Sequence, residues 1–424
     1  MFEKGVPVNV LLLTAPNPFR RQHLQRVREG GHRLVLMGRD AAEHAEPVDL
    51  VAEVDISAVE EVVARARELH RQTGGFDAVL TFVEHGVTAA AAVAADLGLS
   101  SVSPAAAYLS RDKYAMHLAL TEGSVRMPAT VLVGSVPAAL QAAETLGYPV
   151  VLKPVIGSDS TCVLRVDGER QLAAEFDRLR AVAWENYQFD SLHGVVRENY
   201  GEQLLIQEYI PGREVSVESL VVNGVTHCVA VHDKPLPMEG PDFSEVYFAT
   251  PSGLPVGVQE QLSEVTAAAN KLLGVDTGVT HTEFRITDQH EVVLLESAAR
   301  IGGGGIQSSV RHSTGVDLVG AMVDLVSGVT PVLEPRPVPR PTGWFILFAD
   351  RSGVLTGVRG IEALRADPRV LDLELYCQVG SRIELSAQVS SAWLGRVVFT
   401  AGTRAELDAT FHELWDTVEF VIED

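Results

Sequence analysis

The sequence is poor in cysteine and contains no long apolar run. Its three cysteines, Cys162, Cys228 and Cys377, lie far apart without a CxxC pair, which argues against a disulfide framework and a cysteine-rich zinc site. No stretch of about eighteen uncharged apolar residues occurs, so no membrane span is expected. The apolar run near the N-terminus (MFEKGVPVNVLLL) is short and continues into a candidate strand. We therefore expect no signal peptide and predict a cytoplasmic protein.

Positive charge is also scarce. The chain has 34 Lys and Arg residues against 56 Asp and Glu residues, which gives a formal net charge of −22. A surface this acidic repels nucleic acids and anionic membranes, so we expect neither as a partner. An anionic small molecule could bind only where local cations or a metal ion offset this charge. The length of 424 residues predicts two to four structural units, because single cores rarely grow past about 250–300 residues.

The first part of the chain alternates strand and helix signals. Continuous apolar runs of the kind found in buried parallel strands occur at 8–14, 33–38, 48–55 and 76–82. Helical segments follow at 20–30, 57–71 and 87–97. This rhythm predicts a doubly wound parallel sheet. No GxGxxG follows the first strand, so a dinucleotide site is not supported.

Glu84 and His85 follow the fourth predicted strand. Ligands of open α/β sheets bind at that edge, which makes the pair candidate binding residues. A polar loop after a strand is an equally good interpretation.

The remaining chain predicts mixed α/β structure and a β-rich tail. Helices are expected within 104–123, at 137–146, 169–183 and 257–273, and strands at 127–135, 148–154, 162–166 and 204–224. Residues 279–287 and 291–297 predict a β-hairpin, and residues 184–203 are expected to be irregular. The proline-rich stretch 332–343 predicts a rigid linker before a small β-rich unit.

The predicted hairpin carries an unusual polar face. Alternation along VTHTEFR places His281, Glu283 and Arg285 on one side of the strand, and Glu296 ends the partner strand. Two carboxylates on adjacent strands repel one another unless a cation lies between them, and magnesium favours such ligands together with phosphate oxygens. An ordinary charged surface is the alternative. It is the better interpretation for Glu296 alone, but not for the whole set.

Arg300 and the four glycines at 302–305 follow directly. Without Cβ atoms, the backbone N–H groups of such a loop can approach an anion closely, and an arginine can clamp a carboxylate with two hydrogen bonds. A plain flexible connection is the alternative. Lys113 near a helix start, and Lys153 at the end of a buried strand before a Gly/Ser turn, suit phosphate contact. Taken singly, each is more typical of a surface lysine.

The order of these segments resembles a known family. Lys113 and Lys153-Pro154 are followed by EYIPGRE (208–214), HTEFR (281–285) and ESAARIGGGG (296–305). This series is similar to the ATP-grasp superfamily of carboxylate–amine ligases, and its last two segments resemble the L-amino acid ligase branch, which makes dipeptides. The resemblance implies an ATP-grasp fold combining α/β and α+β parts. Its implied domains are an N-terminal α/β domain (1–110), a small lobe (111–205), a large lobe with the metal and substrate site (206–334) and a β-rich C-terminal domain (335–424).

The resemblance also implies roles for individual residues. The ATP contacts would be Lys113 and Lys153 at the phosphates, Gly157, Ser158, Ser160 and Thr161 in a mobile phosphate cover, Glu208, Tyr209 and Ile210 at the adenine, and Glu214 at the ribose. The ligands of Mg²⁺, or alternatively Mn²⁺, would be Glu283 and Glu296. His281 and Arg300 would be catalytic, and substrate contacts would come from Glu84, His85, Arg300, Gly303, Gly304 and Gly305. Many relatives carry Asn two residues after the second glutamate, where this chain has Ala298, so the number of metal ions stays open.

The implied reaction is the ATP-dependent joining of a carboxylic acid, such as an amino acid, to an amine through an acyl phosphate. The glycines at 302–305 predict room for a large acid. A homodimer is an allowed alternative to a monomer. Other functions remain open at this point: a tailoring ligase acting on a specialised metabolite or carrier-bound group, a regulatory nucleotide-binding module suggested by Ala298, or a sugar- or amino-acid-binding protein built on the α/β domain.

Overall fold

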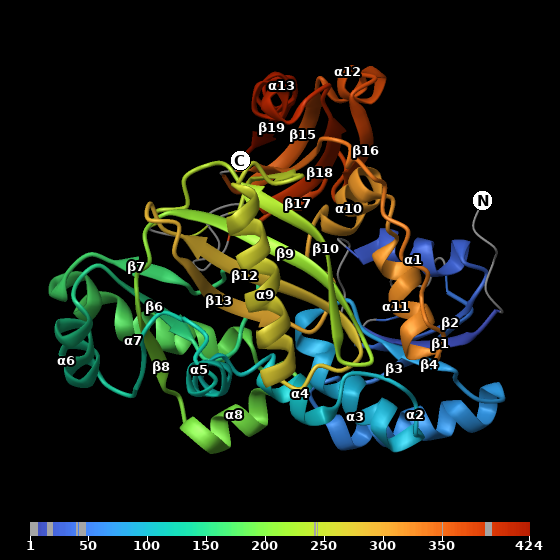
Figure 1. The fold of residues 1–424 in the computed structure, drawn as a ribbon, viewed down its shortest axis with the longest axis horizontal. Coiled ribbons are helices and arrows are strands. Elements are labelled where there is room, and N and C mark those ends of the chain that lie inside the picture. Colours follow the sequence, from blue (N-terminus) through green and yellow to red (C-terminus); the bar gives the residue numbers. More distant parts are fainter. Residues whose placement is uncertain are drawn as a thin grey trace.

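The computed structural model of the chain describes residues 7–14, 20–39, 41, 48–240, 243, 245–349, 351–385 and 392–424. The strands of this part form four sheets, whose arrangement is shown in Figure 1. None of the helices in these residues has the length and hydropathy needed to cross a membrane.

The N-terminal sheet confirms the predicted doubly wound architecture. Its strands are β1 (Asn9–Leu13), β2 (Arg33–Gly38), β3 (Leu50–Glu53) and β4 (Ala78–Leu80), parallel and in the order β3-β2-β1-β4. Its helices are α1 (Arg21–Glu29), α2 (Val59–Thr73) and α3 (Val87–Leu97). Alternate side chains of β1 enter two different cores on opposite faces, which explains its continuous apolar run. The 3₁₀ turn Glu84–Gly86 follows β4 and begins α3.

A second, antiparallel sheet forms the small lobe. It contains β5 (Thr130–Val133), β6 (Val150–Pro154), β7 (Leu164–Val166) and β8 (Leu204–Glu208), in the order β5-β8-β6-β7. Helices α6 (Val136–Leu146) and α7 (Glu169–Asn186) share its core. Helices α4 (Pro104–Leu109) and α5 (Lys113–Glu122) connect this lobe to the N-terminal sheet.

The expectation of an irregular segment at 184–203 is wrong. Helix α7 continues to Asn186, and a further helix, α8 (His193–Tyr200), follows. The fully buried Val196 of α8 packs with Tyr187, Leu192 and Leu205. This contact with a strand of the small lobe gives the helix its stability, and the local polar composition does not reveal it.

The large lobe is built on an eight-stranded sheet with the order β13-β12-β9-β10-β11-β14-β18-β16. The strands from this lobe are β9 (Arg213–Val222), β10 (Val225–Lys234), β11 (Tyr247–Thr250), β12 (Gly278–Ile286) and β13 (Val292–Ala298). The helices are α9 (Val256–Leu272), α10 (Ile306–Thr314) and α11 (Leu318–Val326). The predicted hairpin is confirmed as β12 and β13. Helix α11 also contacts β4 and α1, and so joins the large lobe to the N-terminal sheet.

The tail completes this sheet. Strand β14 (Thr342–Ala349) pairs with β11, and β18 (Ala392–Thr400) and β16 (Val370–Leu375) extend the edge. The other tail elements are β15 (Gly353–Arg359), α12 (Ile361–Ala366), β17 (Arg382–Ile383), the 3₁₀ turn Arg404–Glu406, α13 (Leu407–Trp415) and β19 (Glu419–Glu423). Figure 1 shows the tail in red beside the large lobe. The sheet is continuous across the domain boundary predicted at residue 335, and the boundary itself stays a prediction.

Candidate active site

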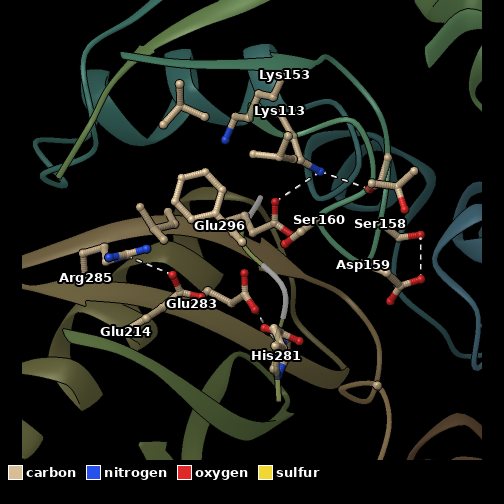
Figure 2. Close-up of a pocket in the computed structure, with 18 of the residues that line it drawn as sticks. Lys113, Lys153, Ser158, Asp159, Ser160, Glu214, His281, Glu283, Arg285 and Glu296 are labelled. Carbon is tan, nitrogen blue, oxygen red and sulfur yellow. Dashed lines mark hydrogen bonds and ion pairs between the residues drawn. The ribbon is translucent and has the colours of Figure 1, made fainter. Parts of the chain in front are cut away.

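The candidate site is a pocket between the small lobe, the polar face of β12 and β13, and the glycine loop (Figure 2). Most residues singled out in the sequence line it: Lys113, Lys153, Gly157, Ser158, Ser160, Thr161, Glu208, Tyr209, Ile210, Glu214, His281, Glu283, Glu296, Arg300, Gly303 and Gly304. Glu84, His85 and Gly305 do not line this pocket. The structure thus brings together residues nearly two hundred positions apart, although the roles assigned to them remain predictions.

Two lysines enter the pocket from the small-lobe side. Lys113, the first residue of α5, donates to the Gly157 carbonyl at 3.1 Å and lies 3.1 Å from a carboxylate oxygen of Glu296. Lys153 on β6 is 6% exposed and makes no ion pair within the described residues. Burial, with the nearby charge of Lys113, lowers the pKa of Lys153 to about 8 despite the opposing effect of Glu296. A buried, unpaired ammonium of this kind favours a bound anion.

The turn after β6 has a strained backbone. Gly157, Asp159 and Ser160 have φ values of +156°, +55° and +52°. A Cβ atom on Gly157 would lie 2.8 Å from the Tyr187 hydroxyl, so a side chain is excluded there. Consecutive residues in the left-handed region turn their N–H groups to one side, as anion-binding loops do. The turn is therefore suited to cover phosphate groups.

An aromatic wall closes the other end of the pocket. Tyr209 stacks on Phe243 with ring centroids 6.5 Å apart, and the Arg165 guanidinium lies 4.8 Å from the Tyr209 ring centroid. Glu208 precedes Tyr209, and its carboxylate accepts from the Ala129 N–H at 3.0 Å, which secures the end of β8. Flat apolar surface at the end of a strand suits a purine ring.

Three carboxylates meet below this wall. Oxygens of Glu214, Glu245 and Glu283 lie within 4.8 Å of one another. The Lys234 ammonium lies among them, 2.6 Å from Glu214 and 2.9 Å from Glu283, and it also pairs with Glu245. These carboxylates hold the pKa of Lys234 well above its usual range even though burial opposes this, and burial raises the pKa of Glu245 to about 7. The Lys234 cation therefore offsets part of the negative charge of this cluster.

Lys234 and Glu245 were missed in the sequence. The only signal is that VAVHDK ends a strand, and Glu245 lies in a connection without a motif. Glu214, predicted at the ribose, also accepts a hydrogen bond from Arg285 Nε at 2.9 Å.

Glu283 and Glu296 face each other in the register of β12 and β13. Both line the pocket, and the hairpin places Glu283 beside His281 and Arg285, as the alternation predicted. Carboxylate oxygens are hard donors of the kind that Mg²⁺ prefers. In the structure Glu283 contacts Lys234 and His281, and Glu296 contacts Lys113, so the metal-binding role of the pair stays a prediction.

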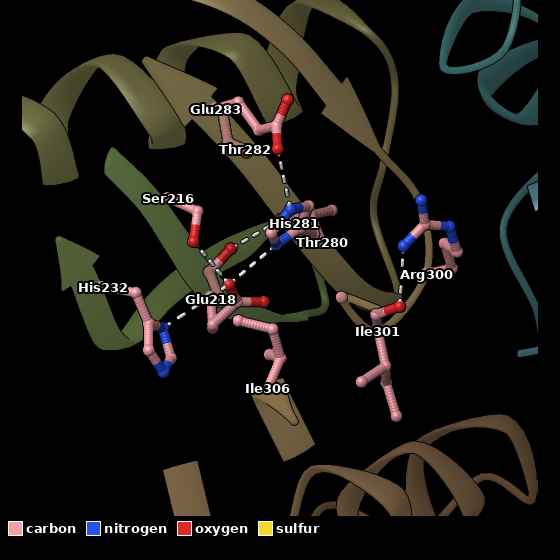
Figure 3. A network of polar contacts seen from close by, with 12 residues as sticks. Ser216, Glu218, His232, Thr280, His281, Thr282, Glu283, Arg300, Ile301 and Ile306 are labelled. Carbon is pink, nitrogen blue, oxygen red and sulfur yellow. Dashed lines mark hydrogen bonds and ion pairs between the residues drawn. The ribbon is translucent and has the colours of Figure 1, made fainter. Parts of the chain in front are cut away.

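His281 belongs to a buried polar network (Figure 3). Its Nδ1 lies 2.7 Å from Glu218, and its Nε2 lies 3.4 Å from Glu283. Burial lowers the pKa of His281, but the fully buried carboxylate of Glu218 outweighs this and raises it to about 10. His281 is consequently an imidazolium at neutral pH and acts as a fixed cation. Glu218 was also missed in the sequence.

Arg300 is held from behind by acidic residues. Its Nε pairs with Glu84, and Arg111 binds the other oxygen of Glu84 at 2.6 Å while pairing with Asp190. Burial alone would raise the pKa of Glu84, but Arg300 and Arg111 outweigh it and lower the pKa to about 2. Glu84 thus contacts Arg300 instead of the pocket. His85 is also outside the pocket, with its ring against Phe189 at 4.8 Å and its pKa lowered to about 3 by burial.

The glycine loop is shaped mainly by a tryptophan of the tail. A Cβ atom would lie 2.4 Å from the Trp344 ring at Gly304, where φ is +55°, and 2.6 Å from it at Gly305. At Gly302 it would lie 2.8 Å from His281 Nδ1. Only Gly303 is open, with Arg20 Nη2 as its one neighbour, at 3.9 Å. Most of the missing side chains therefore make room for Trp344 of β14 and for His281, and Gly303 alone faces free space.

Two segments of the chain match known domain families. Residues 146–308 match the ATP-grasp domain family, and residues 345–423 match the L-amino acid ligase C-terminal domain 2 family. Residues 146–308 thus carry an ATP-grasp domain, as the resemblance indicated. Residues 345–423 match the C-terminal domain described for L-amino acid ligases.

Individual relatives agree with this assignment. Alanine–anticapsin ligase of Bacillus subtilis is 27% identical over 281 residues, which cover 63% of this chain and 57% of that protein. Carnosine synthase 1 of Gallus gallus is 28% identical over 343 residues, covering 77% of this chain and 36% of that protein. The chain thus spans about half the length of the first relative and about a third of the second. The crystal structure of an L-amino acid ligase from Bacillus licheniformis superimposes over all of both chains with a TM-score of 0.85 at 22% identity, which shows the fold.

Proposed function

We propose that this protein is an ATP-dependent, ADP-forming ligase that joins the carboxyl group of an amino acid to an amine, most simply the amino group of a second amino acid. The observation that carries the proposal is the layout of one pocket. It has an aromatic wall, two lysines and a strained turn, paired carboxylates, and then Arg300 beside an open glycine. One pocket thus holds groups suited to adenine, phosphates, a metal ion and a substrate carboxylate. The names of the two relatives and the family of the tail support the same reaction class.

In the first step, a carboxylate oxygen of the acid attacks the terminal phosphorus of ATP, and the bond from that phosphorus to the ADP oxygen breaks. Both reactants are negative, so the site must supply positive charge. Lys113 and Lys153 meet the phosphate oxygens, and Arg300 meets the carboxylate. Mg²⁺ held by Glu283 and Glu296 would supply further neutralisation of the phosphates.

In the second step, the amine nitrogen attacks the acyl carbon, phosphate leaves, and the nitrogen loses a proton to give the amide. Negative charge grows on the acyl oxygen as the nitrogen attacks. Arg300 and the imidazolium of His281 are fixed cations on that side of the pocket, and each needs no reorganisation at the moment of reaction. Loss of such an electrostatic contact typically lowers the rate on the order of 10²–10³-fold.

The test is to incubate the protein with Mg-ATP and pooled amino acids, and to measure phosphate release together with product masses. The expected result is phosphate and ADP, with a product mass equal to two amino acids less one water. Turnover only after a carrier protein or another amine is added would indicate a tailoring ligase. AMP and pyrophosphate would refute the acyl-phosphate route, and ATP binding without turnover would indicate a regulatory module.

A further inference from the structure

Arg20 is a buried cation at the junction of three parts of the chain. It precedes α1, is 6% exposed, and donates from Nη1 to the Gly302 carbonyl at 3.1 Å. Its buried Nε has no hydrogen-bond partner. No carboxylate of the described residues lies within ion-pair distance of it, and burial, together with repulsion from Arg300, lowers the pKa of Arg20 to about 10. The guanidinium is therefore dehydrated and not neutralised.

The surrounding charges do not balance. Arg20 adjoins a buried network in which Arg111 and Arg300 share Glu84, and Arg111 also pairs with Asp190. We call these five residues the junction cluster. Each is at most 7% exposed, and together they comprise three cations and two carboxylates. An unpaired buried charge is strongly unfavourable, so the cluster calls for one further anion.

The groups that face Arg20 from neighbouring elements do not supply this anion. Asp159, on the turn after β6, attracts Arg20 but is exposed and outside ion-pair distance. His23 of α1 is fully buried with no partner for either ring nitrogen, and burial holds its pKa well below the usual range, so it is neutral. Tyr376, from the tail, presents a hydroxyl whose pKa is raised by burial, so it supplies no negative charge. Among the residues that the structure describes, this position thus has no carboxylate of its own, although the chain has a net charge of −22.

Gly303 lies between Arg20 and the pocket. This residue lines the pocket, and in the described part of the chain the one atom given within 4 Å of a Cβ built on it is Arg20 Nη2, at 3.9 Å. The first turn of α1 has no side-chain cap, so its backbone N–H groups add a favourable field for an anion. The loop carbonyls are fixed meanwhile, since Gln22 Nε2 donates to the Gly304 carbonyl at 3.2 Å. A small anionic group in the pocket can therefore approach Arg20 past a residue that has no side chain.

We propose that Arg20 binds the carboxylate of the amine substrate, so that the acceptor is an amino acid and not a simple amine. The inference rests on the proposed function. The reacting acid must lie with its carboxyl at Arg300 and the phosphates, whereas Arg20 lies beside Gly302 and Gly303. In an α-amino acid, the amino nitrogen and the carboxylate carbon are bonded to the same Cα. Anchoring the carboxylate at Arg20 therefore holds the amino group beside Gly303, where it can face the acyl carbon.

The experiment separates acid activation from amine capture. Hydroxylamine replaces the amine in one assay and traps the acyl phosphate as a hydroxamate without needing a carboxylate subsite. The second assay measures dipeptide formation with an α-amino acid acceptor and with the corresponding amino acid amide. Arg20→Gln is compared with Arg20→Lys and with Arg21→Gln, which changes the exposed neighbour.

Arg20→Gln should leave hydroxamate formation unchanged and lower kcat/KM for the amino acid acceptor by about 10²-fold, mainly through KM. It should also abolish the preference for the amino acid over its amide. Arg20→Lys should recover part of the loss, and Arg21→Gln should behave as the unsubstituted protein. Because Arg20 is an unpaired buried cation, its removal should leave the melting temperature unchanged or raise it.

Three results would overturn the inference. If Arg20→Gln lowers hydroxamate and dipeptide formation equally, Arg20 contacts the acid substrate or its acyl phosphate instead of the acceptor carboxylate. The proposed function would still stand. A fall in melting temperature with unchanged acceptor preference would make Arg20 a structural residue. Absence of hydroxamate in the unsubstituted protein would refute the proposed function, and the inference would fall with it.

Discussion

Glu84 holds two arginines that come from different parts of the chain. One oxygen contacts Arg111 at 2.6 Å, and the other pairs with Arg300, which lines the pocket. All three side chains are at most 8% exposed. Replacing Glu84 by Gln keeps the shape and removes the charge. The change therefore tests whether this carboxylate fixes Arg300 in the ligand-free protein.

The magnitude follows from the pKa of Glu84. A shift from 4.5 to about 2 corresponds to about 3 kcal/mol of stabilisation of the folded state. Because the folded-state pKa is the lower one, this stabilisation is fully present above about pH 4.5 and is lost as the pH falls through about 2. Removing one partner of a buried pair typically costs about 3–5 kcal/mol, which agrees with the first figure. We therefore expect Glu84→Gln to lower the free energy of unfolding by about 3 kcal/mol at pH 7.

The assay is denaturant unfolding at pH 7 of Glu84→Gln, Arg300→Gln and the double variant. If the ion pair is formed, the two single effects are not additive, with a coupling of about 2 kcal/mol, since Arg111 still neutralises Glu84 when Arg300 is absent. The exposed pair Arg359–Glu419 serves as the matched control and should show little or no coupling. Additive effects at Glu84 and Arg300 would refute the reasoning. So would a Glu84→Gln variant as stable as the unsubstituted protein.

Three further predictions concern the pocket. Lys153→Met should weaken ATP binding by about 10–100-fold because it removes a charged hydrogen-bond donor. In the unsubstituted protein, the Kd for ATP should increase as the pH rises above about 8, because Lys153 then loses its proton. Calorimetric titration between pH 7 and 9 measures both effects. Glu283→Gln and Glu296→Gln should each lower the rate of phosphate release by about 10²-fold and raise the Mg²⁺ concentration needed for half-maximal release. An unchanged Mg²⁺ dependence would count against metal binding by these two residues. Gly304→Ala should destabilise the protein by about 2–4 kcal/mol, from its positive φ and the contact with Trp344, and thermal unfolding of the double variant with Trp344→Phe should recover part of the loss.

The sequence predicts best those parts of the fold whose signal is local. The apolar runs of β1 and β2 identify buried strands because, after the first residue of each strand, every residue is buried. The ala-rich segment at 87–97 becomes α3 with the same bounds. The alternation of His281, Glu283 and Arg285 survives folding because a strand always places such residues on one face.

The missed site residues share a different property. Lys234, Glu245 and Glu218 carry no motif, and each gains its environment only when β9, β10 and β12 pair. The environment of the glycine run at 302–305 likewise depends on tertiary packing. Its composition predicts space, but only the packing of β14 against the large lobe shows that Trp344 occupies most of it.

Charge placement links these observations. The acidic surplus of the chain belongs to its surface, whereas the buried groups that face the pocket are arranged as cations with defined partners. Lys234 is balanced by three glutamates, His281 by Glu218, and Arg300 by Glu84. Lys153 and Arg20 differ, because neither has an ion-pair partner among the described residues. A buried charge without a partner lowers stability. We therefore interpret Lys153, which lines the pocket, and Arg20, which lies beside the lining residue Gly303, as the places where two substrates bring their own negative charge: the phosphates at Lys153 and the acceptor carboxylate at Arg20.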